Sequence, residues 1–116
     1  MPLSLTKRKA VNATVVDLTG RIVFGAECDL LRSEVKGVIG SQPKPKVILN
    51  LKEVEYVDSG GVGTLVGLYT SAKGAGGELM LVGANPRVQH VLEITKVVTV
   101  LGTYATEEKA VAALAS

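Results

Sequence analysis

The sequence of 116 residues is poor in the side chains that most often carry chemistry. It has one cysteine, Cys28, and one histidine, His90, so it cannot form an intramolecular disulfide or assemble a usual Cys/His zinc site. Aromatic residues make up 3% of the chain, and tryptophan is absent. Single-stranded nucleic acids and sugars are bound by stacking on several aromatic faces, so such ligands are disfavoured. We therefore expect no metal site, no cofactor and no catalytic residues.

An excess of charge of one sign is also missing. Thirteen basic residues face eleven acidic ones, and three of the basic ones lie together at 7–9, where they can protect an edge strand from pairing. This balance does not indicate a nucleic-acid-binding surface. The first ten residues lack the apolar segment of a signal peptide, and the longest uncharged stretch, 59–72, is too short to cross a bilayer. We expect a cytoplasmic chain that neither binds nucleic acid nor inserts into a membrane.

Hydrophobic residues make up 47% of the chain, which is enough for a globular core. Their spacing alternates between strand-like and helix-like periods along the sequence. Strands are predicted at 3–11, 13–19 with a short extension at 21–24, 46–51 continuing towards 57, 78–82 and 97–101. Helices are predicted at 26–39, after Ser59, after Asn85 and after Thr106. This order predicts a single α/β domain over 1–116, with a mixed sheet, an antiparallel leading pair and about four helices.

Chemically suggestive features concentrate at 58–63, where the buried strand turns into the second helix with the sequence DSGGVG. Ser59 can cap this helix, and Gly60 and Gly61 leave backbone N–H groups unobstructed at its positive end. A phosphate on Ser59 would meet these donors. The glycines match neither the dinucleotide fingerprint nor a P-loop. The Gly63–Gly67 pair is predicted to let the helix pack closely on the sheet.

The segment from Val47 to Val88, VILNLKEVEYVDSGGVGTLVGLYTSAKGAGGELMLVGANPRV, resembles the STAS domain of anti-sigma factor antagonists. Members of this family show an aliphatic strand, an Asp-Ser-Ser/Thr-Gly-Leu-Gly segment that begins a helix, and Gly-Gly before the next strand. The resemblance implies that Ser59 is the phosphoacceptor of an anti-sigma factor serine kinase. It also implies that the unphosphorylated form binds this kinase and releases the sigma factor, and that a serine phosphatase restores that form.

The resemblance further implies partner contacts around Ser59, at Asp58, Gly60, Gly61, Val62 and Thr64. Family members often have a second hydroxyl residue at the position of Gly60.

A second departure from the family lies earlier in the chain. Many antagonists have an acidic residue at the position of Val23, which here follows Arg21 by two residues. Both departures fall on the expected partner surface.

Several alternatives remain open on the sequence alone. Ser59 could be only a helix cap, and Asp58 only a favourable charge at the helix start. The chain could be a STAS module that acts as a scaffold or regulator in a signalling or transporter complex without sigma control. It could also be a small enzyme or anion-binding protein that uses the glycine-rich helix start. Cys28 is expected to be an inert core residue and His90 a surface residue.

Overall fold

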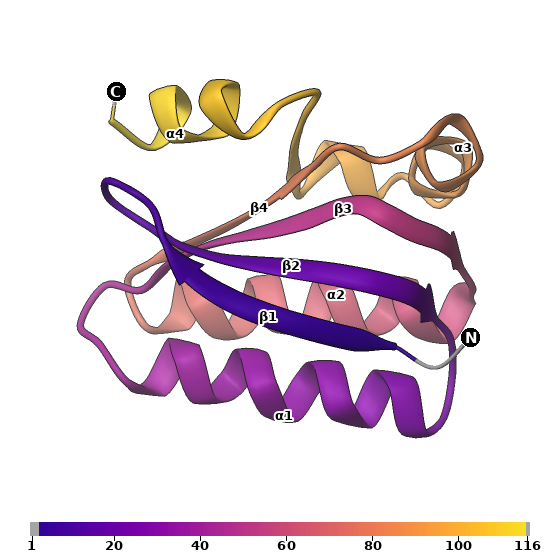
Figure 1. Cartoon of the computed structure of the whole chain (residues 1–116), viewed down its shortest axis with the longest axis horizontal. Coiled ribbons are helices and arrows are strands. Elements are labelled where there is room, and N and C mark those ends of the chain that lie inside the picture. Colours follow the sequence, from indigo (N-terminus) through magenta and orange to yellow (C-terminus); the bar gives the residue numbers. More distant parts are fainter. Residues whose placement is uncertain (1–2, 116) are drawn as a thin grey trace.

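The computed structural model describes residues 3–115 and is built around a five-stranded sheet with the strand order β1-β2-β3-β4-β5 (Figure 1). In chain order the elements are β1 (Ser4–Lys9), β2 (Thr14–Ile22), α1 (Ala26–Gly40), β3 (Lys46–Val57), α2 (Ser59–Gly74), β4 (Glu78–Val82), α3 (Pro86–Ile94), a 3-10 turn (Val97–Thr99), β5 (Gly102–Tyr104) and α4 (Glu107–Ala115). Strand β1 is antiparallel to β2, and the other neighbours are parallel. The predicted mixed sheet with an antiparallel leading pair and four helices is confirmed.

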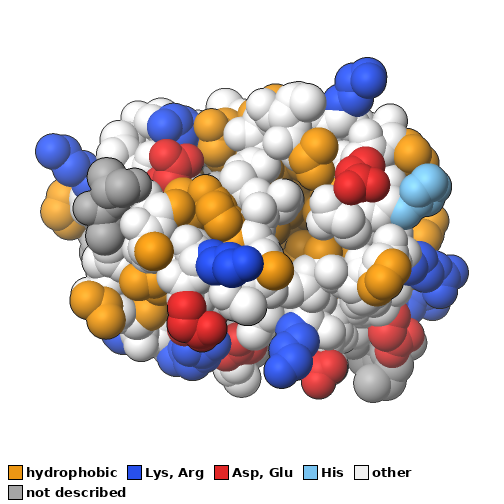
Figure 2. Space-filling model, turned by 90° about the horizontal axis from the view of Figure 1, so that it is seen from above, with side chains coloured by type: hydrophobic (Ala, Val, Ile, Leu, Met, Phe, Trp, Pro, Cys, Tyr) orange, Lys and Arg blue, Asp and Glu red, His pale blue; other side chains and the backbone are white. Residues whose placement is uncertain are grey.

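The helices lie on both sides of the sheet (Figure 1). Helices α1 and α2 cover one face, and α4 lies across the other, with α3 beside it at the far end. Seen from the side of α3 and α4, the surface carries basic and acidic side chains interspersed with apolar ones (Figure 2). Within residues 3–115, no helix has the length and hydropathy that crossing a membrane requires.

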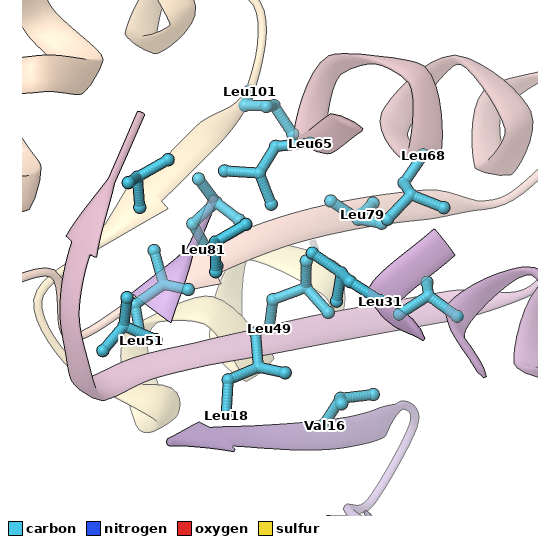
Figure 3. Packing of buried hydrophobic residues seen from close by; sticks show 14 of the residues in the cluster. Val16, Leu18, Leu31, Leu49, Leu51, Leu65, Leu68, Leu79, Leu81 and Leu101 are labelled. Carbon is cyan, nitrogen blue, oxygen red and sulfur yellow. The ribbon is translucent and has the colours of Figure 1, made fainter. Parts of the chain in front are cut away.

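The central strand β3 explains why both faces must be covered. Its alternate residues Leu49 and Leu51 are fully buried in a large cluster under α1 and α2 (Figure 3), whereas Ile48 packs in a second cluster with Ala110 and Leu114 of α4. A nearly continuous aliphatic run is the pattern of a strand buried on both sides. Burial of this aliphatic surface is the main stabilising contribution to the fold.

The predicted strand at 97–101 is wrong. Residues Val97–Thr99 form a 3-10 turn, and the last strand is Gly102–Tyr104. Lys96 has a positive φ of 62°, and the amide of Leu101 donates to the carbonyl of Val97 at 2.9 Å. An extended segment would place Val97, Thr99 and Leu101 on one face of the sheet, but Val97 and Leu101 are buried while Thr99 between them is exposed. The β-branched composition of the segment is therefore overridden by burial.

Strand β2 joins the predicted strand at 13–19 to part of the predicted extension at 21–24, and this length positions the candidate site. At Gly20, where the first predicted strand segment ends, the backbone has a positive φ of 117° and the pairing register with β3 shifts. The pairing with β3 nevertheless continues to the pair Ile22 and Val57. Beyond this pair, the amide of Asp58 donates to the carbonyl of Ile22 at 3.2 Å. The segment after β2 therefore lies directly against the start of α2.

Candidate functional site

The start of α2 is capped by Asp58. Its backbone is extended, with φ −94° and ψ −176°, and its carboxylate accepts a hydrogen bond from the amide of Gly61 at 2.8 Å. The prediction that Ser59 caps the helix is wrong, because Ser59 is already the first helical residue. An Asp at this position satisfies one unpaired amide and places negative charge at the positive end of the helix dipole.

Ser59 is freed for another role by this arrangement. It is exposed at the first position of α2, and within residues 3–115 its hydroxyl makes no hydrogen bond. The first amides of a helix have no partner within the helix, so those of Ser59 and Gly60 remain available to an anion on this side chain. The site can accept a modification without breaking an existing side-chain contact.

Asp58 also fixes the segment that follows β2. Its second carboxylate oxygen accepts from the amide of Phe24 at 3.1 Å. Phe24 lies over Gly60, where a Cβ added to the glycine would come within 2.9 Å of the Cβ of Phe24. Phe24 is 83% exposed, beside the first turn of α2. The sequence analysis missed this residue, because no local periodicity links positions 36 apart and a lone phenylalanine is usually buried.

The remaining predicted partner residues lie further inside. Gly61, Val62 and Thr64 are all buried against the sheet or α1. A Cβ on Gly61 would come within 2.2 Å of the carbonyl oxygen of Ile22, so the glycine permits the close approach of α2 to β2. The structure thus brings Ser59, Asp58 and Gly60 to the surface, and the three buried residues support them from below.

A small polar contact links this helix start to α1. The Thr64 hydroxyl donates to the carbonyl of Gly60 at 3.0 Å and accepts from Arg32 at 3.3 Å. Arg32 also pairs with Asp29 at 3.1 Å. Thr64 is 5% exposed, so its hydroxyl is satisfied by these bonds rather than by a partner.

The predicted close packing of the Gly63–Gly67 pair on the sheet is wrong. Both glycines are exposed, and a Cβ added to either would find no atom within 4 Å. They face a hollow of about 380 Å³ between α1 and α2, whose mouth includes Phe24 and Gly60. The sheet-facing side of α2 is formed instead by residues such as Leu65.

The second departure from the family pattern lies at the other rim of the site. Val23 is half-buried, while Arg21 is exposed and pairs in register with Tyr56. The guanidinium of Arg87, from α3, lies 5.0 Å from the centre of the Tyr56 ring, in cation-π geometry. Two arginines therefore border the end of β3 just before Asp58.

The strongest ion pairs lie away from this site, between β1, β2 and α4. Arg8 donates to Asp17 at 2.6 Å and to Glu107 at 2.5 Å. These bonds raise the pKa of Arg8, and the guanidinium of Arg8 holds the pKa of Asp17 below its usual range, with help from a hydrogen bond that Asn50 donates. The cluster joins the edge strand to the last helix, and it is a structural feature.

The structure offers little other chemistry among residues 3–115. No group of three or more His, Cys, Asp or Glu side chains is placed to hold a metal ion in this part of the chain. Cys28 is buried in the core as expected, and His90 is exposed at the surface. The arrangement at Ser59 is therefore the strongest candidate for a functional site.

Comparison with known proteins identifies the family to which this fold is similar. A family model described as the STAS domain matches residues 4–110. A protein named anti-sigma F factor antagonist from Paenibacillus polymyxa is 27% identical over 100 residues, which cover 86% of this chain and 85% of that protein. Two solved structures show the same fold. An anti-sigma factor antagonist (STAS) domain protein from Planctomyces limnophilus has a TM-score of 0.84 at 23% identity, covering 97% of this chain and 98% of that one. The Bacillus cell fate determinant SpoIIAA in its phosphorylated form has a TM-score of 0.68 at 21% identity, covering 93% and 96%.

Proposed function

This chain belongs to the STAS domain family, and from that membership we propose that it is an anti-sigma factor antagonist switched by phosphorylation of Ser59. The relative named anti-sigma F factor antagonist supports the general role. The observation that carries the proposal is the exposed hydroxyl of Ser59 at the first position of α2, which makes no hydrogen bond to the residues that the structure describes and lies next to the capping Asp58. In this role the chain is a substrate and a binding partner of another protein.

The proposed cycle has two forms of the chain. In the unphosphorylated form it binds an anti-sigma factor serine kinase, which then releases its sigma factor. The kinase transfers the terminal phosphoryl group of ATP to the Ser59 oxygen, so that an O–P bond forms, ADP leaves and the hydroxyl proton is lost. A serine phosphatase hydrolyses the ester and restores the first form.

The fold can hold the phosphate without rearranging. The free amides at the start of α2 and the helix dipole both favour an anion on Ser59. The new group adds about −1.5 to −2 charges beside the carboxylate of Asp58. On a partner surface that fits a neutral hydroxyl, burying this charge without a counter-ion costs several kcal/mol. Since each 1.4 kcal/mol is tenfold in affinity, we expect a loss of roughly two decades or more.

The other residues of the site have distinct proposed roles. Asp58 and Gly60 contact the partner together with Ser59, since they lie at the surface or half-buried beside it. Gly61, Val62 and Thr64 contribute indirectly, because they are buried and hold the first turns of α2 in place. Substitution of these three is expected to change stability as well as binding.

Phosphotransfer in vitro tests the proposal. The chain is incubated with ATP and each anti-sigma serine kinase of its own host, and the product is examined by intact-mass and peptide mass analysis. We expect one added phosphate on Ser59, and none on Ser59→Ala. Ser71→Ala, which removes a hydroxyl near the other end of the same helix, is the matched control and should be phosphorylated like the wild type. Phosphate on another residue, or labelling of Ser59→Ala, would contradict the proposal.

A further inference from the structure

We infer that Phe24 and the hollow between α1 and α2 form the surface on which the partner kinase docks beside Ser59. The inference rests on the proposed function and adds the chemistry of the partner. The kinase is expected to carry an apolar pocket for the Phe24 ring, and next to it an apolar projection bordered by a carboxylate. The occupant of the hollow is thus a segment of a protein, not a small molecule.

Phe24 is held in place although its ring is exposed. The residue is 83% exposed, but its backbone is held by the bond from its amide to Asp58 at 3.1 Å. Gly60 gives it room, since a side chain there would meet the Cβ of Phe24 at 2.9 Å. An exposed aromatic ring on a fixed backbone is typical of an interface anchor, because little ordering is required when it is buried.

The hollow continues from this ring along α2. Its floor is bare helix backbone at Gly63 and Gly67, and its volume is about 380 Å³. Small residues let a second backbone or an apolar side chain approach a helix closely. The floor ends at Leu68, which is itself 1% exposed and belongs to the core. The hollow can therefore receive a projecting side chain without any change in the fold.

Basic side chains on α1 favour a partner that carries negative charge at this place. Arg32 and Lys36, four residues apart, both line the hollow. Arg32 is paired with Asp29, whereas Lys36 has no ion pair within the part of the chain that the structure describes. A carboxylate on the partner would therefore find an unpaired cation at this wall. Such complementarity guides association more than it adds affinity.

The position of the ring selects a protein as the occupant. A small anion or metabolite in the hollow would cover only part of Phe24, because this residue lines the hollow and is also 83% exposed. Only an extended surface can cover the ring, enter the hollow and reach Ser59 together. The kinase proposed to modify Ser59 must contact this same end of α2, so the two contacts are continuous.

The test is a titration of the chain against the kinase that phosphorylates Ser59 in vitro, in the absence of ATP. Phe24→Ala and Gly67→Leu are each expected to weaken binding at least tenfold, and Lys36→Glu several-fold with a reduced salt dependence. Ile94→Ala removes another exposed apolar side chain, 64% exposed on α3, and should bind like the wild type. Gly74→Leu places the same leucine on α2 outside the hollow and should also have no effect.

Folding and self-association are measured on the same samples. Far-UV circular dichroism and thermal melts show which variants are folded, and Gly67→Ala provides a smaller intrusion if the leucine disturbs the helix. Wild-type affinity of Phe24→Ala and of the folded Gly67 variant would overturn the docking surface while leaving the proposed function intact, provided that Ser59→Asp still weakens binding. No kinase binding by the wild type would overturn both. Loss of a dimer in sedimentation, with kinase affinity unchanged, would mean that a second copy occupies the hollow and would also overturn the inference.

Discussion

Two glycines in the first turns of α2 should respond in opposite directions to the same substitution. Gly61 and Gly63 are two positions apart, and both lie in helical backbone. A Cβ on Gly61 would lie 2.2 Å from the carbonyl oxygen of Ile22 and 2.8 Å from a methyl carbon of Val57. A Cβ on Gly63 would meet nothing within 4 Å. Alanine at each position therefore separates helix propensity from packing.

The expected magnitudes follow from these surroundings. Replacing glycine by alanine within a helix stabilises it by about 1 kcal/mol, so Gly63→Ala should raise the free energy of unfolding by about 0.5–1 kcal/mol. For Gly61→Ala the same gain is offset, because α2 must move away from β2. Overpacking of this kind costs about 1–3 kcal/mol, and the disturbed cap at Asp58 costs about 1 kcal/mol more. We expect a net destabilisation of about 1–3 kcal/mol.

Urea denaturation followed by far-UV circular dichroism measures this difference, since the chain has no tryptophan for fluorescence. With a slope of roughly 1–3 kcal/mol per molar, the midpoints of the two variants should differ by about 0.5–4 M, on opposite sides of the wild type. Equal stability of Gly61→Ala and Gly63→Ala, or a Gly61→Ala variant more stable than the wild type, would refute the close approach of α2 to β2.

Three further predictions concern the fold around the site. Asp58→Ala should lower the free energy of unfolding by about 1–2 kcal/mol. Asp58→Asn should lower it less, because Asn keeps the cap on Gly61 and loses only the bond from the Phe24 amide; equal losses in urea titrations would contradict this. Arg8 lowers the folded-state pKa of Asp17, so its stabilisation is present above the unfolded pKa of about 3.9 and lost as the pH falls through the lower folded value. In Asp17→Asn the free energy of unfolding should therefore fall less steeply as the pH is lowered, and the difference should be no more than about 1 kcal/mol because the pair is partly exposed. The same fall in the variant as in the wild type would exclude the Arg8–Asp17 pair as its cause. Gly77→Ala should abolish soluble expression or cooperative unfolding, because its Cβ would come within 1.8 Å of the Pro45 carbonyl oxygen; a normal melt would contradict the contact.

The local features of the fold were predictable because their signals are local. Asn85 and Thr106 were expected to begin helices, and their side chains accept from the amides of Val88 at 2.8 Å and Lys109 at 3.3 Å. The aliphatic run at 46–51 lies in the centre of the sheet as expected. Capping and strand composition act over a few residues, so neighbouring sequence is sufficient to indicate them.

The side of α2 on which each glycine lies was not predictable, for a physical reason. The helix has one charged residue, Lys73 near its end, and five of its sixteen residues are glycine, so no charged stripe marks the side that faces water. The contacts with β2 decide instead that Gly61 points inward and that Gly63 and Gly67 point outward. The exposure of Phe24 has the same origin, since it depends on a bond to Asp58 from a distant part of the chain.

The choice between Asp58 and Ser59 as the cap shows the same limit at smaller scale. Both residue types are good caps, and they are adjacent, so composition cannot decide between them. The bond from the Asp58 amide to Ile22 and the bond from the Phe24 amide to its carboxylate hold Asp58 in the capping position. Ser59 is thereby moved into the helix, where its hydroxyl is exposed.

The central claim is that a phosphate on Ser59 switches partner binding, and the most direct measurement compares two forms of the same chain. The kinase that modifies Ser59 is titrated, without ATP, with the unphosphorylated chain and with chain fully phosphorylated on Ser59, as established by mass analysis. We predict that the dissociation constant of the phosphorylated form is larger by on the order of a hundredfold, with unchanged circular dichroism. Equal affinity of the two folded forms would contradict the switch.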